Sequence, residues 1–146
     1  MIHIAVQRDA IDIAAEQCAA AVADAGGVAS FVVYVRADDG VALLELEHYP
    51  RATEAALQMV ASEAAERWGL RGVRIVHRVG PMVPGDAIVF VAAAASHRGS
   101  ALEACAFLID RLKTDAPFWK KETRADGTRW VEPRGSDEAA AARWDA

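Results

Sequence analysis

The sequence predicts a single α+β domain, with a mostly antiparallel sheet and about three helices. The length of 146 residues fits one domain. Short segments rich in β-branched and aromatic residues come in pairs, and longer segments with helical spacing of apolar residues stand between them. Paired strands separated by helices favour the α+β class over a parallel, doubly wound sheet, although this pattern leaves the strand order open.

In the first third of the chain we expect a short strand at residues 2–6 and then a helix. Asp9 can cap the start of this helix, and the Gly26-Gly27 pair would end it. Residues 28–36 and 41–49 have strand composition, and the turn sequence ADDG lies between them. The two strands are therefore predicted to pair as a hairpin.

The middle of the chain contains the clearest amphipathic helix, at residues 51–68, with apolar side chains on one face. Two more strands are expected at residues 72–80 and 87–95, separated by a turn with two prolines. The last helix spans residues 100–114 and is ended by Pro117, because proline lacks the N–H group and disfavours a helical residue before it.

The C-terminal region predicts a closing hairpin, formed by WKKET at 119–123 and TRWVE at 128–132. We expect the folded domain to cover residues 1–134. The remaining segment, 135–146, is acidic and rich in alanine, which is consistent with either a short helix or a frayed end.

Composition excludes several classes of function. The formal net charge is -5 and the pI about 5.3, which argues against nucleic-acid binding. Cys18 and Cys105 stand among alanines in helical patterns, which predicts buried free thiols. The four histidines lack zinc-site spacing, so no metal is expected. The start of the chain does not resemble a signal peptide and no apolar run could span a membrane, so we expect a cytoplasmic location.

One segment contradicts the acidic average, because residues 96–122 concentrate cationic side chains. They are His97, Arg98, Arg111, Lys113, Lys120 and Lys121. Lys113 lies one turn after Ile109, on the flank of an apolar stripe that includes Leu102 and Cys105. This position suits an amine at the edge of a cleft; the alternative is a lysine that extends to water or balances the negative end of the helix.

Lys120 follows Pro117, so a reversal of the chain would bring it near Lys113, and an anion between the two amines would relieve their repulsion. Lys121 is interpreted as a solvated charge. His97 and Arg98 stand at a strand-to-helix junction, where either an anion contact or simple helix-start packing is expected.

Two further candidate residues lie before this segment. Arg36 ends an apolar strand and points either into a site or into water. Phe31 is interpreted as a core residue.

The motifs SHR (96–98), IDRLKTDAPFWKKE (109–122) and G-x-RWVE (127–132) resemble those of the large, catalytic subunit of molybdopterin synthase. FVVYVR, LELEHYP, IVHRVG and PGDAIVFV occur upstream in the same order as in that family. The resemblance spans residues 2–134, and it implies a hammerhead-like α/β fold. It also implies sulfur transfer to cyclic pyranopterin monophosphate, without a cofactor. The donor would be the C-terminal thiocarboxylate of a ubiquitin-like small subunit, and the large subunit would form a homodimer within a heterotetramer.

The same resemblance implies roles for individual residues. Lys113 would be the catalytic lysine beside the thiocarboxylate, and Lys120 a second pocket lysine. The remaining residues would bind the pterin and its phosphate, with His97 and Arg98 contributed across the dimer: Arg36, His97, Arg98, Phe31 and Arg134.

The chain departs from the family pattern at Val33, where glycine is usual, and in the short ADDG loop. These departures motivate an alternative, in which the chain is a non-catalytic module that binds a ubiquitin-like tail or a phosphorylated small molecule.

Overall fold

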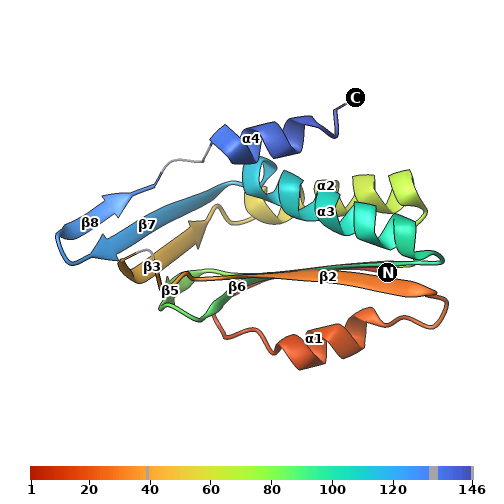
Figure 1. The fold of residues 1–146 in the computed structure, drawn as a ribbon, viewed down its shortest axis with the longest axis horizontal. Helices are drawn as coiled ribbons and strands as arrows, with labels where there is room; N and C mark the ends of the chain where they lie inside the picture. The colour runs from red at the N-terminus through yellow and green to blue at the C-terminus, as the bar shows by residue number, and fades with distance from the viewer. Residues whose placement is uncertain (39, 132–134, 146) are drawn as a thin grey trace.

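A computed structural model describes residues 1–38, 40–131 and 135–145, with only the backbone described for 135–137. Two four-stranded sheets and four helices make up this part of the chain. Figure 1 shows a long central sheet with helices on both faces and the second sheet at one end. The predicted α+β class is confirmed, and most strand pairs are antiparallel.

The central sheet has the strand order β1-β4-β6-β2. Its strands are β1 (Ile2–Gln7), β4 (Gly72–Arg78), β6 (Ala87–Ala95) and β2 (Gly27–Tyr34). β1 and β4 run parallel, whereas β6 is antiparallel to both of its neighbours. β6 has buried side chains along most of its length because helices cover both faces of the sheet.

Helices α2 (Ala52–Trp68) and α3 (Arg98–Asp115) cover one face of the central sheet, and α1 (Ile13–Ala20) covers the other (Figure 1). The main core lies under α2 and α3, where Leu57, Phe107 and Leu108 pack on the sheet. A smaller cluster under α1 includes Val76 and Phe90. The C-terminal segment forms α4 (Gly135–Ala142), which lies over α3.

The second sheet has the strand order β5-β3-β7-β8 and is antiparallel throughout. It consists of β5 (Gly80–Met82), β3 (Val41–His48), β7 (Phe118–Arg124) and β8 (Gly127–Trp130). β7 and β8 form the predicted closing hairpin, which is confirmed. Since β7 follows α3 directly, the end of α3 lies where the two sheets meet.

The predicted hairpin between residues 28–36 and 41–49 is wrong. β2 pairs along its whole length with β6, from Gly27 opposite Ala95 to Tyr34 opposite Ala87. The ADDG connection instead takes the chain into the second sheet, where β3 pairs with β5 and β7. Both strands have the expected composition, but alternating side chains do not specify which strand is the neighbour.

Several expectations about single residues also need correction. α1 starts at Ile13 because the carboxylate of Asp12, not Asp9, accepts the N–H of Ala15 at 3.1 Å, and the helix ends at Ala20, well before the glycine pair. Cys105 is buried as predicted, but Cys18 is exposed.

Two apolar side chains that we expected to be buried are exposed. Leu102, assigned to the core stripe of the last helix, is 61% exposed. Phe31 is 52% exposed, although Ala29 and Val33 on either side of it pack against the main core.

Candidate functional site

A cavity of about 460 Å³ lies where the two sheets meet the C-terminal end of α3. This volume is within the range of small-molecule sites. Its walls come from the end of β2, the starts of β6 and β7, the inner face of β3 and the last turn of α3. The apolar part of the lining includes Val33, Leu44, Leu46, Ile88 and Leu112.

Three of the predicted site residues line this cavity, and each comes from a different element. Lys113 is an exposed residue in the last turn of α3, Lys120 is a half-buried residue of β7, and Arg36 follows β2. The structure thus brings together three cations from distant parts of the chain. Arg36 and Lys120, the two that are furthest apart, are separated by 84 residues (120 − 36). Arg36 also contacts Asp38 at 3.3 Å, in an exposed pair that contributes little stability.

The period of the β-strand explains why Lys120 faces the cavity. Phe118, Lys120 and Glu122 alternate along β7 and all three line the cavity, because every second side chain points to the same face of a sheet. Lys121 points to the other face, where its Nζ lies 3.9 Å from Glu45 Oε2. Lys121, interpreted above as a solvated charge, has a side chain that is 37% exposed, and its Nζ also lies 5.4 Å from the centroid of the Trp130 ring.

His77 on β4 also lines the cavity, and the sequence reasoning missed it. The residue is 4% exposed, and its ring stacks on Phe118, with 3.9 Å between the centroids and 19° between the planes. Nδ1 lies 2.8 Å from the carbonyl of Arg78, so Nδ1 must carry the proton and donate. Burial, aided by the electrostatic influence of Lys113 and His48, lowers the pKa of His77 to about 4 despite that hydrogen bond. The ring is therefore neutral at neutral pH and adds no positive charge to the site.

Glu122 is the second lining residue that was missed. It is 7% exposed, and its carboxylate accepts from Arg124 Nη2 at 3.0 Å and lies 3.8 Å from Arg129 Nη2. A signal for it was present in the sequence, because Glu122 stands two residues after Lys120 in a segment predicted to be a strand. His77 had no comparable signal, since a histidine in an apolar strand is compatible with an ordinary core position.

The structure does not bring His97 and Arg98 to this cavity. They lie at the N-terminal end of α3, and Lys113 is 15 residues further along the helix from Arg98. At a rise of 1.5 Å per residue this separation is roughly 22 Å. The cations of residues 96–122 thus form no single cluster within one chain, and Arg111, which is held by Glu63, Asp115 and Asp145, serves the fold.

The remaining residues that were predicted to bind the pterin are Phe31 and Arg134. Phe31 lies on the edge strand β2 and is not among the residues that line the cavity. Arg134 lies outside the described residues. Val33, at the position where the family resemblance implies a glycine, lines the cavity, as Arg36 does.

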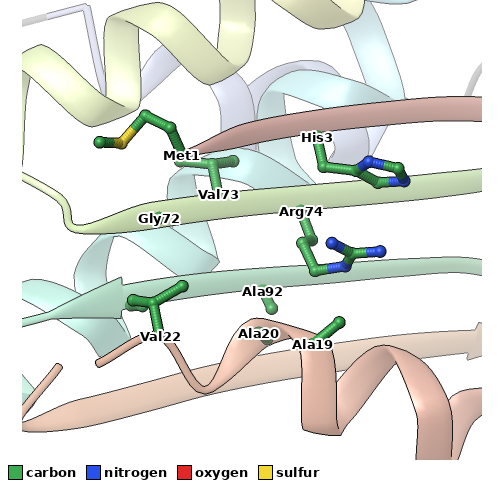
Figure 2. Close-up of a pocket in the computed structure, with 10 residues that line it drawn as sticks. Met1, His3, Ala19, Ala20, Val22, Gly72, Val73, Arg74 and Ala92 are labelled. Atoms are coloured by element: carbon green, nitrogen blue, oxygen red, sulfur yellow. The ribbon is translucent and has the colours of Figure 1, made fainter. Parts of the chain in front are cut away.

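A second, much smaller cavity of about 40 Å³ lies between α1 and the central sheet. Figure 2 shows it beside Met1, His3, Val22 and Arg74. It is far below the size of a substrate site. The guanidinium of Arg74 is already engaged, because Nε and Nη2 donate to Glu16 Oε1 at 3.0 and 2.8 Å.

Two other kinds of site were sought in the described part of the chain. It contains no group of three or more His, Cys, Asp or Glu side chains that could hold a metal ion. None of its helices has the length and apolarity needed to cross a bilayer.

The model of the family described as "MoaE protein" matches residues 6–115. The chain belongs to the MoaE family. A protein from Pseudomonas aeruginosa named molybdopterin synthase catalytic subunit is 54% identical over 123 residues, which cover 82% of each chain. The resemblance seen in the sequence motifs is therefore confirmed. The chain is an enzyme of the molybdopterin synthase class, and its activity serves molybdopterin synthesis.

Solved MoaE structures agree with the fold described above. The molybdopterin biosynthesis MoaE protein of Burkholderia ambifaria has a TM-score of 0.86 and 53% identity, covering 100% of this chain and 99% of that one. A Helicobacter pylori structure, described as a complex of subunits 1 and 2 of molybdopterin-converting factor, has a TM-score of 0.74 and 22% identity, covering 91% of each chain. This second likeness concerns the fold.

Proposed function

We propose that this MoaE chain transfers sulfur from the C-terminal thiocarboxylate of a ubiquitin-like small subunit to cyclic pyranopterin monophosphate, forming the dithiolene of molybdopterin. The observation that carries the proposal is the convergence of Lys113, Lys120 and Arg36 on one cavity. Both reactants are anions, so they repel each other unless cations surround the place where they react. A cavity lined by Lys113, Lys120 and Arg36 meets that need in a protein whose formal net charge is -5.

In this proposal Lys113 holds the thiocarboxylate and stabilises charge while the sulfur attacks the side chain of the pterin. As each carbon–sulfur bond forms, a carbon–oxygen bond of the side chain breaks, and the oxygen leaves with the opened phosphate at one carbon and as water at the other. Each addition gives a thioester, and water then cleaves the acyl–sulfur bond. Two thiocarboxylated small subunits are consumed, because the dithiolene contains two sulfurs. The small subunit leaves as a carboxylate and the sulfur stays on the substrate. Lys113 exchanges protons with the reacting groups during these steps. Lys120 stabilises the negative charge that develops as the cyclic phosphate opens, and Arg36 binds the phosphate.

The remaining pterin contacts come, in this proposal, from a second copy of the chain. His97 and Arg98 are too far from Lys113 to serve the same cavity within one chain, because they lie at the opposite end of α3. The edge strand β2 exposes Val28, Phe31 and Tyr34, which suits burial against another copy. Phe31 would then lie next to the ligand in the dimer rather than in the monomer.

The test is a reconstitution with the purified chain, cyclic pyranopterin monophosphate and the thiocarboxylated small subunit. The dithiolene product is the expected result, and the small subunit with an ordinary C-terminal carboxylate is the matched control. Binding of the small subunit without any product would overturn the proposal in favour of the non-catalytic module, with Val33 and the ADDG loop as the reason.

The dimer has a test of its own. Lys113→Ala and Arg98→Ala chains, each inactive alone, should regain part of the activity when mixed and allowed to exchange subunits. Mixed dimers then contain one site with both residues intact. If the mixture stays inactive although the chains exchange, Arg98 does not act across a dimer.

A further inference from the structure

The turn between α3 and β7 determines how the two pocket lysines face each other. Lys113 stands two residues before the end of α3, and Lys120 stands two residues after the start of β7. Only Ala116 and Pro117 connect the two elements. Because Pro117 has no N–H group, backbone hydrogen bonding can hold this turn only in part.

Thr53, near the start of α2, forms a hydrogen bond to the turn between α3 and β7. Its side chain is fully buried, and Oγ1 donates to the carbonyl of Pro117 at 2.6 Å. The same oxygen accepts the N–H of Tyr49 at 2.9 Å, which leaves its single proton for Pro117. A hydrogen bond excluded from water is costly to break, so the carbonyl of Pro117 has a fixed position.

His77, on β4, contacts Phe118, the residue that follows the turn. Its ring stacks on Phe118 with centroids 3.9 Å apart, and the bond from Nδ1 to the carbonyl of Arg78 fixes the ring plane. Phe118, Lys120 and Glu122 share one face of β7. A rotation of the strand at Phe118 would therefore turn Lys120 away from the cavity.

We propose that Thr53 and His77 are positioning residues for the sulfur-transfer site, which hold Pro117 and Phe118 in place and so set the geometry between Lys113 and Lys120. This inference rests on the proposed function. The contacts from α2 and β4 hold two consecutive residues, Pro117 and Phe118, so a shift of this segment would break at least one of them. A misplacement of about 1 Å between reacting groups can cost on the order of a hundredfold in rate.

The first experiment compares Thr53→Val with Thr53→Ser in the reconstituted enzyme. Valine keeps the shape but removes both hydrogen bonds, whereas serine keeps the hydroxyl. We expect Thr53→Val to lower kcat at least ~10-fold, with little change in the KM for the small subunit, since both lysines still attract it. Thr53→Ser should restore most of the rate. Val76→Ala, in the separate core under α1, is the control for lost stability and should leave kcat unchanged.

His77→Phe and His77→Asn form a second pair. Phenylalanine keeps a ring against Phe118, whereas asparagine keeps a donor for the carbonyl of Arg78 but has no ring. If the ring positions the turn, His77→Phe retains clearly more activity than His77→Asn. Equal losses in the two variants would instead assign His77 to proton transfer and overturn its role as a positioning residue.

The two proposals fail in different ways. If the wild type makes no product, the proposed function fails. If the wild type is active and Thr53→Val has the kcat of wild type, or no larger loss than a control of equal melting temperature, the positioning inference fails. All variants are assayed well below the lowest melting temperature of the set, so that each is measured in its folded state.

Discussion

Arg111 and Lys113 lie two residues apart on the same helix, yet the structure uses them differently. The side chain of Arg111 is 15% exposed, and its guanidinium lies 2.7 Å from Asp145, 3.3 Å from Asp115 and 3.7 Å from Glu63. Lys113 is exposed at the edge of the cavity. Because two residues correspond to about 200° around a helix, Arg111 faces α2 and α4 whereas Lys113 faces the second sheet.

The surroundings of Arg111 form a structural support, which we call the C-terminal buttress and define as Trp68, Phe107, Asp110, Arg111 and Trp144. Trp144 packs edge-on against Trp68 and Phe107, with centroids 5.6 and 5.7 Å apart, and its Nε1 donates to Asp110 at 2.8 Å. Cations in this region are neutralised by nearby carboxylates. Lys113, Lys120 and Arg36 instead line a cavity, together with Glu122, and this cavity offers a space that an anion can enter.

The largest expected effect is the difference between a substitution of Lys113 and a substitution of Arg111. Lys113→Ala should lower product formation by about 10³-fold, since it removes the group that stabilises charge in the reaction. Its thermal unfolding should match that of the wild type. Arg111→Ala should do the reverse, with normal turnover and a loss of about 1–2 kcal/mol in unfolding free energy. An active Lys113→Ala variant would remove this lysine from the mechanism.

The next largest effect is a loss of stability caused by a substitution in the C-terminal buttress. Trp144→Ala should lower the free energy of unfolding by about 2–3 kcal/mol, because it removes a half-buried aromatic packed against two others. Urea denaturation measures this loss. Turnover at 25 °C should remain normal, since Trp144 does not line the cavity. A large fall in kcat, with the variant fully folded, would show that the two regions are coupled.

The pH dependence of stability tests the burial of His77. Its pKa is about 4 in the folded protein, against 6.5 as the ordinary value. Between these values the unfolded chain binds a proton that the native state does not, so stability falls as pH decreases from 6.5 toward 4. We expect His77 to account for about 2 kcal/mol of loss between pH 7 and pH 5. His77→Phe should lack this component in denaturation curves at the two pH values.

The smallest effect is a contrast between the two thiols. Burial raises the pKa of Cys105 to about 11, whereas Cys18 is exposed on α1. A maleimide reagent at pH 7.5 should therefore modify Cys18 first and leave the activity intact, because Cys18 lies on the face of the sheet away from the cavity. Mass spectrometry of the digested protein identifies the labelled residue. Faster labelling of Cys105 would mean that α3 opens readily.

The local features of this chain were predictable because they depend on short-range patterns. The segments predicted as β4 and β6 and the long helices α2 and α3 appear close to their expected positions, and the closing hairpin is correct. The hairpin between β2 and β3 is wrong because the local pattern does not specify the neighbouring strand, and the rest of the fold places β6 beside β2. The cap at Asp9 is wrong for a local reason, because the carboxylate of Asp12 accepts the N–H of Ala15 and the helix starts after it.

The sequence by itself determined the family and the identity of Lys113, Lys120 and Arg36 as candidates, because motifs carry that information residue by residue. Only the tertiary structure decided that these three share one cavity and that His97 and Arg98 do not. It also revealed His77 and Thr53, whose residue types alone indicate no particular role, and it placed Glu122, which the strand period could have indicated, in the cavity lining. The physical reason is that burial, the facing partner and the direction of a side chain depend on which distant segments pack together, and a pattern of neighbouring residues does not contain that information.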